Sequence, residues 1–146
     1  VPFFILGRPA IATGIGERLD PVQFVPKAWL VILYPGFAVS TRWAYQSLKF
    51  KLTKAIGNTK LDVHLDDYGE LARLLVNDLE TVTIRRYPKI ARLKERLLQE
   101  GAAGALMSGS GSSVFGIFAA ENQARKAFRC LQAEGQDRAF LVPLLT

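Results

Sequence analysis

A run made only of serine and glycine lies between two apolar segments in the last third of the chain. The run is Ser108–Ser112, and the segments are Ala105–Met107 and Val114–Phe118. Both segments have the length of buried strands, and Gly and Ser are common turn residues, so the pattern predicts a hairpin. This hairpin places two adjacent strands in one sheet and constrains the fold more than any other feature.

Ser108–Ser112, called the Ser/Gly loop below, also has a chemical interpretation. Without large side chains its backbone can adopt positive φ and approach another surface closely. Successive N–H groups in such a turn form a concavity suited to an anion such as phosphate. Neither common phosphate fingerprint is present, since there is no G-x-x-x-x-G-K-[ST] and no G-x-G-x-x-G opening a helix. A plain structural turn and an anion-facing loop therefore both stay open.

The remaining elements follow from hydrophobic periodicity and from capping residues. From residue 29 onward they run strand, helices, strand, strand, helix, strand, which is the βαββαβ order of a ferredoxin-like plait with extra helices in its first crossover. The predicted fold class is therefore α+β, with two further strands before the plait. The predicted strands are Phe3–Leu6, Ala10–Thr13, Trp29–Tyr34, Ala105–Met107, Val114–Phe118 and Arg138–Val142; helices begin at Ser40-Thr41, Asp66-Asp67 (continuing through Leu79), Pro88 and Glu121.

Two connections are predicted beside these elements. Pro21 and Pro26 bracket a loop, and the lysine-rich segment Phe50–Lys60 is interpreted as a mobile surface loop. Asn77-Asp78 is interpreted as a helix junction.

Composition narrows the class of protein. The chain has 146 residues, enough for one domain with a substantial core, and a formal net charge of +6, which favours anionic partners. No apolar run has the length of a membrane span, and no secretory signal pattern is present, so we expect no membrane partner. Cys130 is the only cysteine, which excludes an intrachain disulfide and fits a cytoplasmic location.

Few side chains offer catalytic chemistry. His64 is the sole histidine and is interpreted as a surface residue, so neither a zinc site nor a Cys–His dyad can be assembled. Cys130 is interpreted as a small packing residue near the apolar stripe of the last helix. Ser110 and Ser112 lack an evident base. Of Trp43 and Tyr45, one should face the core and the other lie exposed, where an aromatic ring can stack on a base.

Several short strings, in order, resemble one known family. They resemble the galactokinase, homoserine kinase, mevalonate kinase and phosphomevalonate kinase superfamily (GHMP kinases), and within it the branch that phosphorylates 4-diphosphocytidyl-2-C-methyl-D-erythritol. The match covers nearly the whole chain and corresponds to the carboxy-terminal half of such a kinase. The strings are Val1–Phe4, Ala12–Leu19, Pro35-Gly36, Ser40-Thr41, Asn77–Glu80 and Gly104–Phe115, the last resembling the third signature motif.

The resemblance implies a reaction and a set of site residues. The γ-phosphoryl of ATP, with Mg²⁺, would pass to the 2-hydroxyl of 4-diphosphocytidyl-2-C-methyl-D-erythritol, in the non-mevalonate route to isoprenoid precursors. Substrates would lie between two lobes. Tyr45 matches an aromatic residue that stacks on cytosine, and Thr41 matches a polar pocket residue. The third motif, here Ser108, Gly109, Ser110, Gly111 and Ser112, would lie against the phosphate loop of the other lobe.

The resemblance also implies what this chain lacks. The family's catalytic Asp falls just before Val1, and its phosphate loop and catalytic Lys fall further upstream. We therefore expect no catalytic or metal-binding residue in this chain, no binding of ATP and Mg²⁺ by it alone, and no activity alone. Residues 1–28 are expected to form strands at the junction with an amino-terminal lobe, and 29–146 the carboxy-terminal domain. Without that lobe, apolar Val1–Leu6 invites self-association.

Two alternatives come from other functional classes. An RNA-binding plait would explain the positive charge and the strand order, but the strand V-F-G-I-F lacks the basic and aromatic pattern of the RNP1 string, so no specific nucleic-acid partner is expected. A regulatory plait that binds a small molecule would accommodate the Ser/Gly loop. Ligand specificity separates these alternatives from the kinase lobe.

Overall fold

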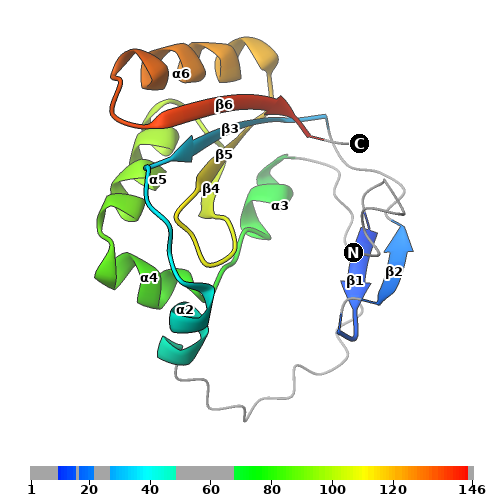
Figure 1. The fold of residues 1–146 in the computed structure, drawn as a ribbon. Coiled ribbons are helices and arrows are strands. Elements are labelled where there is room, and N and C mark those ends of the chain that lie inside the picture. The colour runs from blue at the N-terminus through cyan, green and yellow to red at the C-terminus, as the bar shows by residue number, and fades with distance from the viewer. Residues whose placement is uncertain (1–9, 16, 22–26, 49–67, 145–146) are drawn as a thin grey trace.

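The computed structural model describes residues 10–15, 17–21, 27–48 and 68–144 (Figure 1). The strands are β1 (Ala10–Thr13), β2 (Arg18–Pro21), β3 (Trp29–Tyr34), β4 (Gly104–Met107), β5 (Val114–Phe118) and β6 (Arg138–Pro143). The helices are α2 (Thr41–Ser47), α3 (Tyr68–Arg73), α4 (Glu80–Arg86), α5 (Lys89–Gln99) and α6 (Glu121–Ala133).

Four strands form one antiparallel sheet in the order β4-β5-β3-β6. The two central strands, β3 and β5, are apolar along their whole length, as strands covered on both faces are. Their register pairs Leu33 with Val114 and Trp29 with Phe118. This strand order, together with crossover helices after β3 and β5, is that of the ferredoxin-like plait, so the predicted α+β fold class is confirmed.

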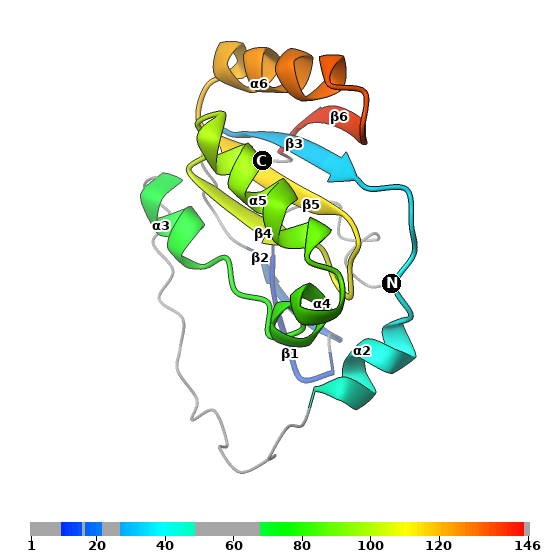
Figure 2. The same cartoon turned by 90° about the vertical axis from the view of Figure 1, so that its left-hand side faces the viewer.

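The core lies between one face of this sheet and two helices. α5 packs on β4 and β5, while α6 packs on β3 and β6 (Figures 1 and 2). Each helix turns an apolar stripe towards the sheet, where it packs against Val31, Leu33 and Phe118. The buried stripe residues are Ile90, Leu93 and Leu97 of α5 and Ala124, Ala127 and Leu131 of α6.

Gly116 in β5 allows α5 to approach the sheet closely. A Cβ atom at this position would lie 3.0 Å from the Cβ of Ala102 and 3.2 Å from the Cβ of Leu97. A strand glycine of this kind marks a place where another element approaches the backbone. The contact fixes α5, and with it the segments at both ends of that helix, against β5.

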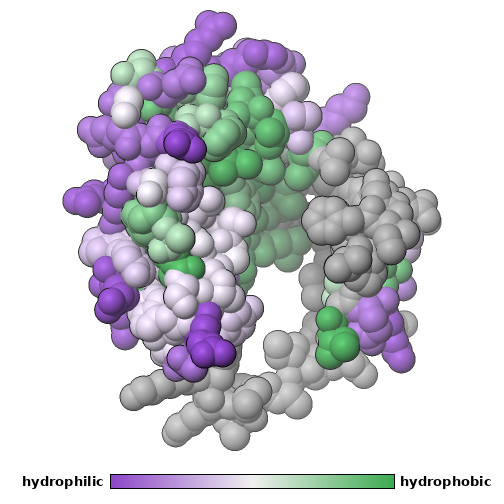
Figure 3. Space-filling model, viewed as in Figure 1, coloured by the Kyte–Doolittle hydropathy of each residue, from purple (hydrophilic) through white to green (hydrophobic). Residues whose placement is uncertain are grey.

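The other face of the sheet is also apolar. The strand register places Leu30, Ile32, Phe115 and Val142 together on it. α3 and the residues after it contact this face at Gly104 of β4. In the space-filling view apolar residues gather over this part of the sheet (Figure 3). Both faces of the sheet are therefore built to be covered.

The amino-terminal part differs from the prediction. Ala10–Thr13 is a strand as predicted, but Arg18–Pro21, for which no strand was predicted, pairs with it as β2. The string R-L-D-P carries little strand propensity, and its pairing with β1 defines it as a strand. β1 and β2 form a separate two-stranded sheet. The predicted strand Phe3–Leu6 lies outside the described residues.

The single helix predicted from Asp66-Asp67 through Leu79 is also wrong. α3 ends at Arg73, Leu74 is 46% exposed, and a new helix, α4, begins at Glu80. The side chain of Asn77 lies in the break, where its Oδ1 accepts from the Leu79 N–H and its amide nitrogen donates to the Met107 carbonyl of β4. Tertiary contacts therefore override helical periodicity here. The junction predicted at Asn77-Asp78 is confirmed; Asp66-Asp67 and the predicted loop Phe50–Lys60 lie outside the described residues.

Cys130 is exposed on α6 and is not a packing residue. Its Sγ lies 3.2 Å from Oε1 of Glu100, because α6 turns this position away from the sheet. The hydrogen bond to Glu100 raises the pKa of the Cys130 thiol, with smaller contributions from burial and from nearby carboxylates.

In the described part of the chain no helix combines the length and apolar content needed to cross a membrane.

The Cys130 thiol should accordingly react slowly with iodoacetamide at neutral pH, because the thiolate is the nucleophile. Replacing Glu100 by Gln removes the carboxylate, lowers the thiol pKa towards its ordinary value and should speed alkylation several-fold near pH 7.5. Rates measured from pH 6 to 10 should show the pH midpoint of the variant shifted downward. Equal midpoints would contradict the contact.

Candidate functional site

The Ser/Gly loop is a tight turn with two glycines at positive φ. Gly109 has φ +54° and Gly111 has φ +91°. The N–H of Gly111 donates to the carbonyl of Ser108 at 2.9 Å, and the N–H of Ser108 donates to the carbonyl of Ser113 at 2.9 Å. The predicted hairpin between β4 and β5 is therefore confirmed. Its turn has the backbone conformation that only glycine adopts readily.

The start of α2 lies against this loop. Ser40 caps the helix as predicted, with its hydroxyl accepting from the Trp43 N–H at 3.3 Å. The hydroxyls of Thr41 and Ser110 are 3.0 Å apart. Tyr45, one turn further along the helix, is 62% exposed. The structure therefore brings Thr41 to Ser110 of the Ser/Gly loop and leaves Tyr45 exposed on the same helix. The role of Thr41 and Tyr45 in substrate binding stays a prediction.

An aromatic cluster anchors α2 to α4. Tyr87 stacks on Phe37 with ring centroids 5.2 Å apart, and meets the edge of Trp43 at 6.0 Å. The Arg86 guanidinium lies 5.3 Å from the centroid of the Trp43 ring. The buried Ser112 hydroxyl donates to the Phe37 carbonyl, which ties the cluster to the Ser/Gly loop. Trp43 thus packs inward while Tyr45 faces out, as predicted for this pair.

On its other side the loop is held by residues that sequence analysis did not single out for function. The Asn77 amide donates to the carbonyls of Met107 and Gly109, each at 2.8 Å. Oε1 of Glu80 accepts from the Met107 N–H at 2.6 Å. Thr83, fully buried, directs its hydroxyl to the Ser110 carbonyl at 3.5 Å. Asn77, Glu80 and Thr83 follow one another at intervals of three residues, so their side chains point to the same side of the chain. This spacing of polar residues is the sequence pattern that could have predicted their shared contact with the loop.

The arrangement offers polar contacts rather than acid–base chemistry. Ser110 bonds to Thr41 and Ser112 bonds to the backbone, so neither has a base within reach in the part of the chain described. The described residues contain no group of three His, Cys, Asp or Glu that could hold a metal ion. His64 lies outside them. A loop with exposed backbone donors and a neighbouring aromatic ring suits the binding of a phosphorylated, ring-containing ligand.

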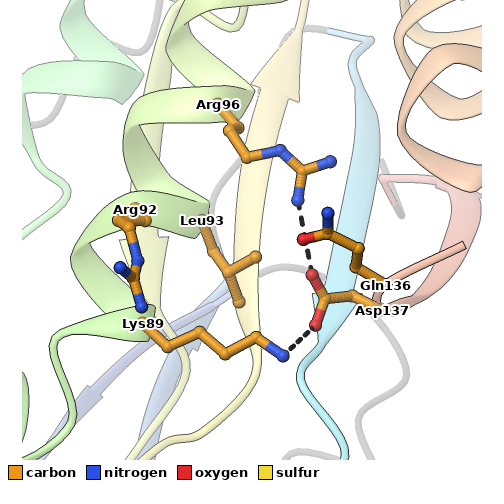
Figure 4. Close-up of a pocket in the computed structure, with 6 residues that line it drawn as sticks. All are labelled: Lys89, Arg92, Leu93, Arg96, Gln136 and Asp137. Atoms are coloured by element: carbon orange, nitrogen blue, oxygen red, sulfur yellow. Dashed lines mark hydrogen bonds and ion pairs between the residues drawn. The ribbon is translucent and has the colours of Figure 1, made fainter. Parts of the chain in front are cut away.

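Away from the Ser/Gly loop, a cavity lies between α5 and the turn before β6, and ion pairs join residues of its lining. It measures about 130 Å³ and is lined mainly by cations and Asp137 (Figure 4). The nearly buried Asp137 carboxylate accepts Lys89 at 2.7 Å and Arg96 at 3.3 Å, and Arg96 also pairs with Glu134. Since two carboxylates balance two of the cations, we interpret this cluster as a contact that holds the turn against α5.

With this geometry established, comparison with known proteins decides the family. The family model described as "GHMP kinases C terminal" matches residues 59–137, more than half of the chain. The chain belongs to the GHMP kinase family. The matched segment contains both Asn77–Glu80 and the Ser/Gly loop, so the resemblance predicted from short strings is confirmed at the level of the family.

Curated relatives are similar over nearly the whole chain. The 4-diphosphocytidyl-2-C-methyl-D-erythritol kinase of Syntrophotalea carbinolica is 49% identical over 142 residues, 97% of this chain and 50% of the relative. The kinase of the same name from Geobacter metallireducens is 52% identical over 127 residues, 87% of this chain and 44% of the relative. The chain thus spans about half the length of the curated relatives it matches.

Solved structures of related kinases are similar to this chain over about half of their length. A crystal structure of 4-(cytidine 5'-diphospho)-2C-methyl-D-erythritol kinase is 34% identical, with a TM-score of 0.77 over 100% of this chain and 53% of that protein. Homoserine kinase from Cytophaga hutchinsonii is 22% identical, with a TM-score of 0.62 over 88% of this chain and 45% of that protein, and shares the fold. This GHMP kinase chain therefore has the fold of one half of those enzymes.

Proposed function

We propose that this chain is the carboxy-terminal, substrate-side lobe of a kinase that transfers the γ-phosphoryl of ATP to the 2-hydroxyl of 4-diphosphocytidyl-2-C-methyl-D-erythritol. The observation that carries the proposal is the hydrogen bond between Thr41 and Ser110, which joins the α2 residues to the Ser/Gly loop beside exposed Tyr45. The relatives of the same name, about twice as long, support it.

In this proposal the two lobes bind different parts of the substrates. Residues 29–146 hold the complete four-stranded sheet and form the lobe, while 1–28, which include the separate β1–β2 sheet, belong to the junction with an amino-terminal lobe. Tyr45 stacks on the cytosine ring and Thr41 contacts the substrate. We assign ATP phosphates and Mg²⁺ mainly to the amino-terminal lobe, with the Ser/Gly loop lying against them, and a cytoplasmic location to the whole enzyme.

Thr41 and Tyr45 would orient the alcohol, and the loop would present backbone donors to a phosphate. Phosphoryl transfer depends mostly on such positioning and on stabilising charge on the transferred group. No proton transfer is assigned to this lobe.

Tyr45→Ala tests the assignment of the cytidylyl pocket in the full gene product that carries these residues. The KM for the cytidylyl substrate should rise about 5- to 150-fold, because stacking of a base on an aromatic ring contributes about 1 to 3 kcal/mol. Tyr45→Phe, which keeps the ring, should stay within about threefold of the parent. Steady-state kinetics with each substrate varied in turn would measure both effects.

Gln46→Ala, at the exposed neighbouring position of α2, is the matched control and should leave both KM values unchanged. The KM for ATP should also be unchanged in Tyr45→Ala. Equal rises for ATP and for the cytidylyl substrate would place Tyr45 in a general structural role, and no rise would remove it from the pocket.

A further inference from the structure

The break between α3 and α4 places an amide side chain directly under the Ser/Gly loop. We infer that Asn77 is a positioning residue for phosphoryl transfer: it turns the loop carbonyls inward and leaves loop N–H groups available to a phosphate. Glu80 assists it by holding the first residue of the turn. The inference rests on the function proposed above and extends it to residues that touch neither substrate.

The bonds of Asn77 use its side chain fully in one orientation. The amide nitrogen donates both of its hydrogens, to Met107 O and to Gly109 O at 2.8 Å, and Oδ1 accepts from the Leu79 N–H at 3.0 Å. Two N–H donors are what one amide nitrogen possesses. The same side chain therefore joins the start of α4 to both ends of the first loop turn, and rotation of the amide would break all three bonds.

The Glu80 carboxylate holds Met107 at its backbone N–H, whereas Asn77 holds it at its carbonyl. Its Oε1 accepts from the Met107 N–H at 2.6 Å, and its Oε2 pairs with Lys94 of α5 at 2.5 Å. Met107 is thus held at its carbonyl by Asn77 and at its N–H by Glu80, three positions further along the same segment. Since the Met107 side chain is fully buried, the entry into the loop is fixed in direction as well as in position.

The consequence is an imbalance between donors and acceptors in the loop. The carbonyls of Met107, Ser108, Gly109 and Ser110 all accept hydrogen bonds from within the protein. The N–H groups of Gly109 and Ser110 have no partner within the described ranges, and neither residue is buried. A turn whose carbonyls are occupied and whose N–H groups are free is electropositive towards an anion. Preorganised donors of this kind stabilise charge that develops during transfer.

Two substitutions at Asn77 separate its donor role from its volume. Asn77→Ala removes all three bonds, whereas Asn77→Asp keeps the size and the acceptor for the Leu79 N–H but sets carboxylate oxygen against two carbonyls. In the full gene product, both should lower kcat about 10- to 100-fold, with the KM for the cytidylyl substrate within about twofold. Assays are run at a temperature at which circular dichroism shows each variant folded.

Asn122→Ala is the matched control, since Asn122 is exposed on α6 and, within the described ranges, its side chain bonds to the N–H of Gln123 alone. It should match the parent in kcat and KM. Hydrogen exchange read by mass spectrometry supplies a second measurement that does not depend on activity. Peptides covering residues 107–113 should exchange faster in Asn77→Ala than in the parent, while those of α6 should not.

Several results would overturn the inference. These are a parent-like kcat in both Asn77 variants, unchanged exchange at 107–113, loss confined to KM, or failure of both variants to fold at any temperature. The last would make Asn77 a residue of stability alone. An inactive but folded parent would instead refute the proposed kinase function, and the exchange data would still decide whether Asn77 orders the loop.

Discussion

Gly111→Ala is expected to lower kinase activity of the full gene product about 10- to 100-fold, and to lower the free energy of unfolding by about 2 to 4 kcal/mol. Gly111 has φ +91°, and an added Cβ would lie 2.8 Å from the Met107 Sδ and 3.5 Å from Cδ1 of Ile90. Both neighbours are fully buried, so they have little room to move. The loop must therefore shift, and its N–H groups with it.

Gly101→Ala is the matched control for backbone strain. Gly101 has φ +93° at the end of α5, but nothing lies within 4 Å of the position of an added Cβ. It should lose only the conformational part of the stability, about 1 to 2 kcal/mol, and keep its activity. Urea unfolding and steady-state kinetics measure the two variants side by side. Equal losses of activity in both would contradict the role of the Ser/Gly loop.

Leu97→Ala is expected to lower the free energy of unfolding by about 2 to 5 kcal/mol. Leu97 is fully buried on α5 and lies directly over Gly116, where the backbone of β5 approaches the helix most closely. Because Gly116 has no side chain to fill the space left by the leucine, the cavity closes poorly. The displacement should also reach the loop, since α5 carries Ile90 beneath Gly111.

Leu98→Ala, the adjacent residue, gives the control for helix propensity and for surface area. Leu98 is 47% exposed, and its substitution should change stability by only about 0.5 kcal/mol. Equilibrium unfolding in urea gives both values. A loss in Leu97→Ala no larger than that in Leu98→Ala would mean that α5 does not pack on β5 as described.

The sheet and its covering helices could be predicted from the sequence because burial requires apolar residues at regular positions, and this pattern is visible in the sequence. The central strands β3 and β5 are apolar throughout, and the stripe of Ile90, Leu93 and Leu97 repeats with the period of a helix. Elements that depend on a partner distant in the sequence show no such local pattern. β2 exists through its pairing with β1, and the break after α3 exists because Asn77 bonds to a loop 30 residues away.

The candidate site shows the same division. The composition of the Ser/Gly loop and the cap at Ser40 could be predicted from local sequence, as could the opposite orientation of Trp43 and Tyr45, although not which of the two faces inward. The approach of Thr41 to Ser110, 69 positions apart, depends on the sheet order and on the aromatic cluster that fixes α2. A local sequence pattern contains neither the sheet order nor the aromatic cluster. The contacts of Asn77 and Glu80 with Met107, 30 and 27 positions away, also depend on the fold and were not predicted.

The most direct test of the central claim is a coupled kinase assay with ATP, Mg²⁺ and 4-diphosphocytidyl-2-C-methyl-D-erythritol. It compares this 146-residue chain alone, the preceding half of the gene product alone, the two mixed, and the intact product. We predict turnover by the intact product, little or none by either half alone, and recovery on mixing that Tyr45→Ala weakens. Turnover by this chain alone, or none by a folded intact product, would contradict its assignment as the substrate-side lobe.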